Sequence, residues 1–129
     1  MNKFEEMGID PIIIKGLVDL GYEKPMPVQE QAIPILLNSE RDLLALAQTG
    51  TGKTAAFGIP ILQNVDISKK VTQALILSPT RELCMQIAGD LADYSKYKKG
   101  LNVLAVYGGS SIDTQIRGLK RGAHVVVAT

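Results

Sequence analysis

One stretch of the sequence combines glycines, a lysine and a hydroxyl at the spacing that binds phosphate: Ala47-Gln48-Thr49-Gly50-Thr51-Gly52-Lys53-Thr54. Glycines let backbone N–H groups approach an anion closely, and a helix that begins near Lys53 would add its unpaired N–H groups. Lys53 would reach the β- and γ-phosphates of a nucleotide, and the Thr54 hydroxyl would bind Mg²⁺, which makes these two the candidate catalytic residues. The stretch predicts a nucleotide site, and the alternative is a plain glycine-rich turn.

Such a site needs a strand before the glycines and a helix after them. The apolar run 43–46 predicts the strand, and a helix from residue 53 is expected to end near Gln63. A second apolar run, 74–77, predicts a buried strand, which Ser78-Pro79-Thr80 ends before another helix. Further strands are expected at 101–107 and 124–128, with a short helix from Ser111 to Arg121 between them. Strands that alternate with helices predict an α/β domain with a mainly parallel sheet and helices on both faces.

The first 38 residues precede this alternation. Asp10-Pro11 predicts the start of a helix, because an acidic N-cap followed by proline suits the first turn. Gly21 predicts the end of that helix. Two prolines are expected to hold the segment 22–29 extended before a second helix, kinked or begun again near Pro34. In a parallel sheet, ligands bind beyond the carboxyl ends of the strands. The phosphate-binding stretch, residues 78–81, Gly108-Gly109 and Thr129 are therefore expected to share one rim.

Composition narrows the class of protein. With 129 residues, 46% of them hydrophobic, the chain is expected to fold as about one ordered domain. The formal net charge is +1, so any contact with a nucleic acid must be local rather than the work of a broad basic surface. A single cysteine, Cys84, excludes an intramolecular disulfide. Without an apolar run of 18 residues or a signal-like start, we expect a cytoplasmic protein.

Four separate stretches of the chain resemble motifs of one family, in that family's order. Residues 21–29 are similar to the Q motif, and 47–54 to motif I, including its alanine in the first position. Residues 79–83 are similar to motif Ia, Gly108-Gly109 to the paired glycine that follows it, and 124–129 to the strand that delivers motif Ib. The chain thus resembles the amino-terminal, RecA-like domain of the DEAD-box ATP-dependent RNA helicases.

This resemblance implies a role for each matching residue. The amide of Gln29 would recognise adenine, which favours ATP over GTP, and the ring of Tyr22 would stack on the base. The ATP site would comprise Tyr22, Gln29, Ala47, Gln48, Thr49, Gly50, Thr51, Gly52, Lys53 and Thr54, with Thr54 also binding Mg²⁺. The RNA site would comprise Pro79, Thr80, Arg81, Gly108, Gly109 and Thr129, which would contact the RNA backbone without sequence preference.

A structural interpretation stands beside each of these roles. Gln29 could be a surface residue at a helix start, and Tyr22 a half-buried core residue. Arg81 could form an ion pair with Glu82 or with another acidic residue of the domain, and the two glycines could form a tight turn after a strand. An aromatic residue near the start, Phe4, matches an isolated family aromatic and could equally pack on the first helix.

The chain departs from the family pattern in two residues and in extent. Met26 stands where the Q motif has a hydroxyl, which could weaken adenine binding, and Cys84 replaces an alanine, where we expect only a packing change. We interpret 1–38 as the Q-motif region and 39–129 as a partial RecA-like ATP-binding core, an incomplete first helicase domain. The Asp-Glu-Ala-Asp motif and the second helicase domain are absent from this sequence.

We therefore expect ATP and RNA to be the ligands. For the intact protein we expect ATP hydrolysis coupled to RNA unwinding. This chain alone is expected to bind nucleotide with scarcely any hydrolysis. Two alternatives stay open: a nucleotide-binding module without catalysis, and another phosphate-loop NTPase or kinase. An apolar sheet edge left open at 125–128 would favour self-association.

Overall fold

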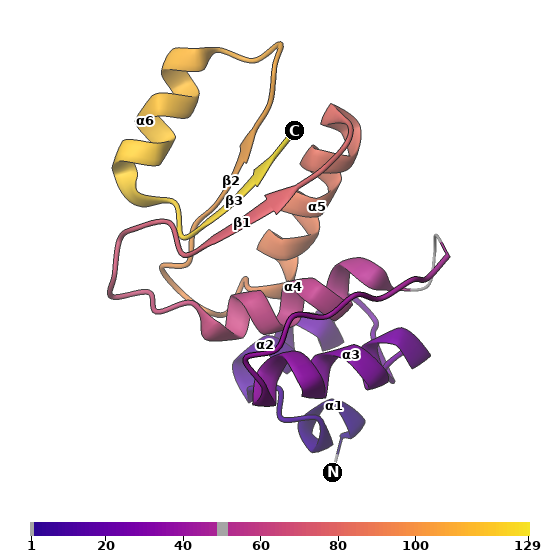
Figure 1. Ribbon diagram of the computed structural model, residues 1–129. Helices are drawn as coiled ribbons and strands as arrows, with labels where there is room; N and C mark the ends of the chain where they lie inside the picture. Colours follow the sequence, from indigo (N-terminus) through magenta and orange to yellow (C-terminus); the bar gives the residue numbers. More distant parts are fainter. Residues whose placement is uncertain (1, 49–51) are drawn as a thin grey trace.

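The computed structural model describes residues 2–48 and 52–129, and a parallel sheet organises its carboxyl-terminal part (Figure 1). Within the described residues the sheet has three strands, β1 (Ala74–Leu77), β2 (Val103–Val106) and β3 (Val125–Ala128), in the order β1-β3-β2. In the register of both ladders, Leu77 and Val106 are opposite Ala128. All three strands therefore end at the same rim, and the predicted parallel α/β arrangement is confirmed.

Helices cover the two faces of this sheet because successive strand residues point in opposite directions. Val125 and Val127 of β3 are buried in the same apolar cluster as Cys84 and Ile87 of α5 (Arg81–Tyr94). On the other face, Leu104 of β2 lies against α6 (Ile112–Gly122), where a Cβ on Gly118 would come within 3.0 Å of the leucine side chain. The two helices lie on opposite sides of the strands (Figure 1).

Four more helices precede the sheet: α1 (Lys3–Glu6), α2 (Pro11–Asp19), α3 (Pro27–Asn38) and α4 (Lys53–Asn64). The predicted start of α2 is confirmed, with Asp10 at its N-cap and Pro11 in its first turn. The start of α3 was predicted too late: the helix begins at Pro27 and runs on through Pro34. Proline at the first helical position is favourable because its missing N–H group has no helical partner there.

The segment before the phosphate-binding stretch is the clearest departure from expectation. Residues 39–48 form neither helix nor strand, so the strand predicted at 43–46 is wrong. Leu44 is 87% exposed and Leu46 is 91% exposed. A strand needs a neighbour for its backbone groups, and the three described strands pair only with one another.

Two glycines, one in α2 and one in α4, let these helices pack closely against α5. A Cβ on Gly16 of α2 would lie 2.6 Å from the carbonyl oxygen of Tyr94, and one on Gly58 of α4 would lie 2.4 Å from the Leu91 side chain. After α5, Lys98 donates from Nζ to three carbonyls at the end of α4, those of Leu62, Gln63 and Val65. Across residues 2–48 and 52–129, no helix has the length and apolar character needed to cross a membrane.

Candidate functional site

The start of α4 carries the described half of the phosphate-binding stretch. Gly52 precedes the helix with φ +82° and ψ 25°, a left-handed conformation that favours glycine. Gly52 has no side chain to cap α4, and an uncapped helix N-terminus is one that can bind an anion. Lys53 is exposed in the first turn and Thr54 is half-buried. Ala47 and Gln48 lie in the irregular segment before the loop, and Thr49, Gly50 and Thr51 lie outside the described residues.

Gln29 joins the Q-motif segment to this loop. Its side chain is only 2% exposed, so the surface interpretation of Gln29 is wrong. Its Oε1 accepts a hydrogen bond from the Met26 N–H (3.0 Å), and its Nε2 donates to the Gly52 carbonyl (3.2 Å). A Cβ on Gly52 would lie 2.4 Å from that Nε2 and 2.9 Å from the Met26 sulfur. The glycine is therefore required by its neighbours as well as by its own backbone.

A small cavity of about 270 Å³ opens beside Gln29. It is lined by the residues of the Q-motif segment: Gly21, Tyr22, Glu23, Lys24, Met26 and Gln29. Tyr22 also lines a larger groove of about 770 Å³, whose other walls include the first turn of α4, the end of β1 and one face of α5. The tyrosine therefore stands between the Q-motif cavity and the groove that leads to Lys53.

The position of Tyr22 depends on a residue that the sequence did not single out. Its hydroxyl lies 3.1 Å from the hydroxyl of Tyr94, and the two ring centroids are 6.0 Å apart at an interplanar angle of 56°. Tyr94 continues the apolar face of α5 that holds Ile87 and Leu91, and it is 3% exposed. Its helical spacing indicates a core residue, and only the tertiary structure brings its hydroxyl to Tyr22.

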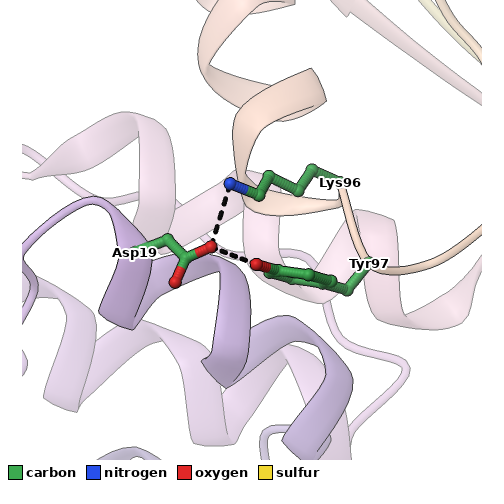
Figure 2. Close-up of polar contacts among 3 residues, drawn as sticks. All are labelled: Asp19, Lys96 and Tyr97. Carbon is green, nitrogen blue, oxygen red and sulfur yellow. Dashed lines mark hydrogen bonds and ion pairs between the residues drawn. The ribbon is translucent and has the colours of Figure 1, made fainter.

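A polar cluster holds the end of α2 against the turn after α5 (Figure 2). The Asp19 carboxylate accepts a hydrogen bond from the Tyr97 hydroxyl and lies 2.9 Å from the Lys96 Nζ. These two contacts, the tyrosine first, hold the pKa of Asp19 below its usual value. Lys15 lies over the ring of Tyr97, 4.4 Å from its centroid. Three residues after Asp19, the Tyr22 N–H donates to the Leu17 carbonyl at 3.0 Å, which ties Tyr22 to the same end of α2.

The predicted RNA residues lie around the carboxyl ends of the strands. The Ser78 N–H donates to Ala128 (2.8 Å) and the Thr129 N–H donates to Val106 (3.2 Å), which ties these strand ends together. Thr80 caps α5, with its Oγ1 accepting from the Leu83 N–H at 3.1 Å. Pro79, Thr80, Arg81, Gly108, Gly109 and Thr129 are all exposed at this rim.

Arg81 links the two halves of the rim. Its Nη1 donates to the Gly108 carbonyl at 3.4 Å, and a Cβ on Gly109 would lie 2.4 Å from the same nitrogen. Gly109 has φ +88°, so backbone conformation and space both favour glycine there. Among the described residues the structure has an ion pair between Lys96 and Asp19 and none that involves Arg81. The expected ion pair of Arg81 with Glu82 therefore does not form.

Three further residues have structural roles. Phe4 is fully buried in the main apolar cluster, which confirms the interpretation that it packs on the first helices. The thiol of Cys84 is buried and donates to the Val127 carbonyl at 3.2 Å. His124 is buried, and its Nδ1 accepts from the Asn102 N–H at 3.0 Å. In the part of the chain that the structure describes, no group of acidic, histidine or cysteine side chains could hold a metal ion by itself.

Comparison with known proteins decides the family. The family model described as DEAD/DEAH box helicase matches residues 26–129. The chain belongs to the DEAD/DEAH box helicase family. Among its DEAD-box relatives, ATP-dependent RNA helicase DeaD of Escherichia coli (strain K12) is 52% identical over 126 residues, and the DeaD protein of Mycobacterium tuberculosis is 51% identical over the same length.

Solved DEAD-box structures share the fold. A DEAD box protein from the hyperthermophile Methanococcus jannaschii superposes on 98% of this chain with a TM-score of 0.92 and 38% identity. Dbp5 of S. cerevisiae, solved bound to RNA and ADP BeF3, superposes on the whole chain with a TM-score of 0.88 and 34% identity. The expected RecA-like α/β fold is confirmed by this likeness.

The likeness covers a minor part of each relative. The match with E. coli DeaD includes 98% of this chain but 20% of the relative, and the match with the M. jannaschii protein includes 34% of that chain. This DEAD-box chain therefore spans about a fifth of the length of the curated relatives it matches.

Proposed function

We propose that this chain is the ATP-binding part of an ATP-dependent RNA helicase, in which ATP hydrolysis drives the unwinding and remodelling of RNA duplexes. The observation that carries the proposal is the hydrogen bond from Gln29 Nε2 to the Gly52 carbonyl. It brings the side chain suited to adenine to the loop suited to phosphates, so one nucleotide can reach both. In this proposal residues 1–38 supply the adenine side, and 39–129 supply the phosphate and RNA sides.

The phosphate side is supported by the start of α4. A left-handed glycine, an uncapped helix N-terminus and an exposed lysine together suit the β- and γ-phosphates of ATP. Thr54, in the first turn, offers a hydroxyl to Mg²⁺, which would neutralise phosphate charge when bound. Of the predicted ATP set, Ala47, Gln48, Thr49, Gly50 and Thr51 remain proposed by their place in the sequence motif.

The adenine side is supported by the cavity beside Gln29. The amide of Gln29 uses one acceptor site and one donor site within the protein, which leaves one of each for a base. That donor and acceptor pair complements the edge of adenine and not that of guanine, which presents a carbonyl where adenine presents an amine. Tyr22 lines the same cavity and offers its ring for stacking.

The RNA side is supported by the rim at the strand ends. Thr80, Arg81, Gly108, Gly109 and Thr129 are all exposed there, and they offer backbone N–H groups and hydroxyls. Such groups contact phosphates and sugars, so they would hold RNA without reading its sequence. The Arg81 guanidinium, which donates to Gly108, retains further N–H donors for a phosphate. We place this activity in the cytoplasm, which the single, unbridged cysteine suits.

Two other functions remain as alternatives. A phosphate-loop kinase would share the start of α4 but would not need an amide at Gln29 buried beside the loop. A nucleotide-binding module without catalysis would share the whole adenine and phosphate site. Turnover of ATP, measured with and without RNA, separates the module from the enzyme.

The proposal is tested by calorimetric titration of the chain with ADP and with GDP in the presence of Mg²⁺. We expect GDP to bind at least about tenfold more weakly than ADP, a difference of about 1.4 kcal/mol. Gln29→Ala should remove this preference. Gln63→Ala should keep it, because Gln63 lies at the opposite end of α4 from Gly52 and does not line the cavity. Equal affinity of the native chain for both nucleotides would contradict the adenine assignment.

Self-association stays a prediction of this proposal. The open edge expected at 125–128 is wrong, because β3 lies between β1 and β2 in the described sheet. The strand β1 lies at an edge instead, and its Leu75 and Leu77 are 62% and 73% exposed. Exposed apolar edge strands favour pairing with another chain. Light scattering should therefore show dimers or larger species at high micromolar concentration, and a monomer there would contradict the prediction.

A further inference from the structure

The ring proposed to stack on adenine is anchored from behind by a second tyrosine. Tyr22 follows the end of α2, where its backbone N–H donates to the Leu17 carbonyl at 3.0 Å, and the residue itself lies in neither a helix nor a strand. Its hydroxyl meets the Tyr94 hydroxyl at 3.1 Å, and the tilted rings have centroids 6.0 Å apart. A half-buried side chain on an irregular segment is thereby connected to a buried residue of the longest described helix, α5.

Tyr94 is a firm anchor for this contact. It is 3% exposed, and its carbonyl oxygen lies so close to α2 that a Cβ on Gly16 would come within 2.6 Å of it. Just beyond α5, Lys96 and Tyr97 bind Asp19 of α2 (Figure 2). Burial and the hydrogen bond with Tyr22 both raise the pKa of Tyr94, so its hydroxyl remains protonated and able to take part in the contact.

We propose that Tyr94 is a positioning residue for the nucleotide base: its buried hydroxyl orients the ring of Tyr22 beside the Q-motif cavity and so sets the affinity for adenine. This inference rests on the proposed ATP-binding function. Tyr94 itself lines the larger groove rather than the Q-motif cavity, so it acts through Tyr22. A ring already held in its binding orientation loses less rotamer freedom when the base arrives.

The expected effect follows from the value of one hydrogen bond. Loss of the contact would let Tyr22 leave its orientation in the free chain, which corresponds to roughly a three- to tenfold weaker binding of the base. In the proposed site the phosphates would bind at the start of α4, whereas the Tyr94 contact acts on the ring that would stack on the base. A ligand that has phosphates and no base should therefore be insensitive to Tyr94.

The test is titration of the 129-residue chain and of Tyr94→Phe with ADP and with pyrophosphate, each with Mg²⁺. We expect Tyr94→Phe to bind ADP roughly three- to tenfold more weakly and to bind pyrophosphate within about twofold of the native chain. Tyr22→Phe should have the same effect on ADP, and the double variant should bind no more weakly than either single variant. The matched control is Tyr107→Phe, which removes the same atom from a half-buried tyrosine that lines neither cavity.

Each other outcome overturns a defined statement. If Tyr94→Phe binds ADP as the native chain does, or if ADP and pyrophosphate weaken together, Tyr94 has no role specific to the base. Additive losses in the double variant would mean that the two hydroxyls act separately. If the native chain prefers neither ADP nor GDP, the proposed function fails first, whereas a native preference for ADP that Tyr94→Phe retains overturns only the positioning role.

Discussion

Two segments of this chain have the same order in the sequence, an apolar run of four residues that precedes a helix, and they differ in their contacts. The run 74–77 forms β1, pairs with β3, and leads to α5, which Thr80 caps. The run 43–46 forms no strand, exposes Leu44 and Leu46, and leads to α4, which Gly52 cannot cap with a side chain.

The difference separates a helix start that has a side-chain cap from its own chain, at α5, from one that has none, at α4. At α5 the Thr80 hydroxyl satisfies a backbone N–H group of the first turn, and Arg81 reaches across to Gly108. At α4 the corresponding place is held by a left-handed glycine whose carbonyl binds Gln29. An uncapped N-terminus beside an exposed lysine suits phosphate, which would supply the partners that Thr80 supplies at α5.

The largest difference in stability between the two segments should appear when one apolar side chain is shortened in each run. Ile76 is buried in the main cluster, so Ile76→Ala should lower the free energy of unfolding by roughly 2–4 kcal/mol through lost burial and the cavity left behind. Leu44→Ala removes an exposed side chain and should change stability by less than about 0.5 kcal/mol. Urea denaturation of both variants measures the difference, and equal losses would mean that 43–46 is packed as β1 is.

Placing a methyl group at the start of α4 should have the next largest effect. Gly52→Ala forces φ +82° on alanine and brings its Cβ to 2.4 Å from Gln29 Nε2, so we expect a loss of roughly 1–3 kcal/mol in stability and at least about tenfold in ADP affinity.

The matched control is Gly89→Ala in α5, where an added Cβ meets nothing within 4 Å. It should stabilise the chain by about 0.5–1 kcal/mol, since alanine favours a helix interior. Thermal unfolding and calorimetric titration of both variants decide the matter. Full ADP affinity in Gly52→Ala would contradict the role given to that loop.

Removing the cap of α5 should have a moderate effect. Thr80→Ala leaves the Leu83 N–H without its side-chain partner and should cost about 1 kcal/mol of stability, whereas Thr80→Asn should retain most of the cap. Denaturant midpoints give the comparison. ADP should stabilise the Thr80→Ala variant as much as it stabilises the native chain, because ADP is proposed to bind at the start of α4 and not of α5. A smaller stabilisation by ADP would mean that the two helix starts are coupled.

The smallest expected effect lies at the other end of α5 and depends on pH. The contacts with Tyr97 and Lys96 hold the pKa of Asp19 below its usual value, so the cluster stabilises the fold above about pH 4 and loses this contribution as the pH falls through the folded-state pKa. Asp19→Asn should therefore lower the melting temperature slightly at pH 7 and make little difference near pH 2. A difference that persists in acid would mean that the ion pair is not its source.

Local signals in the sequence predicted most of the elements because each signal has a local cause. Asp10-Pro11 at the start of α2 and Ser111 at the start of α6 were recognised from the chemistry of helix caps. The strand predicted at 74–77 has the same bounds as β1, and parallel strands, as predicted, end at a common rim. The start of α3 was missed because Pro27 suits both an extended segment and a first helical turn.

What the sequence by itself determined is the set of local conformations and the residue types offered to a nucleotide: a left-handed glycine before a helix, an amide at Gln29, a ring at Tyr22. What only the tertiary structure decided is which groups meet. It joined Gln29 to Gly52, Arg81 to Gly108 and Tyr22 to Tyr94, and it left 43–46 without a partner strand while 74–77 found one. The physical reason is the same in each case: a hydrogen bond between distant residues, or between strands, depends on the packing of elements that no single stretch of sequence contains.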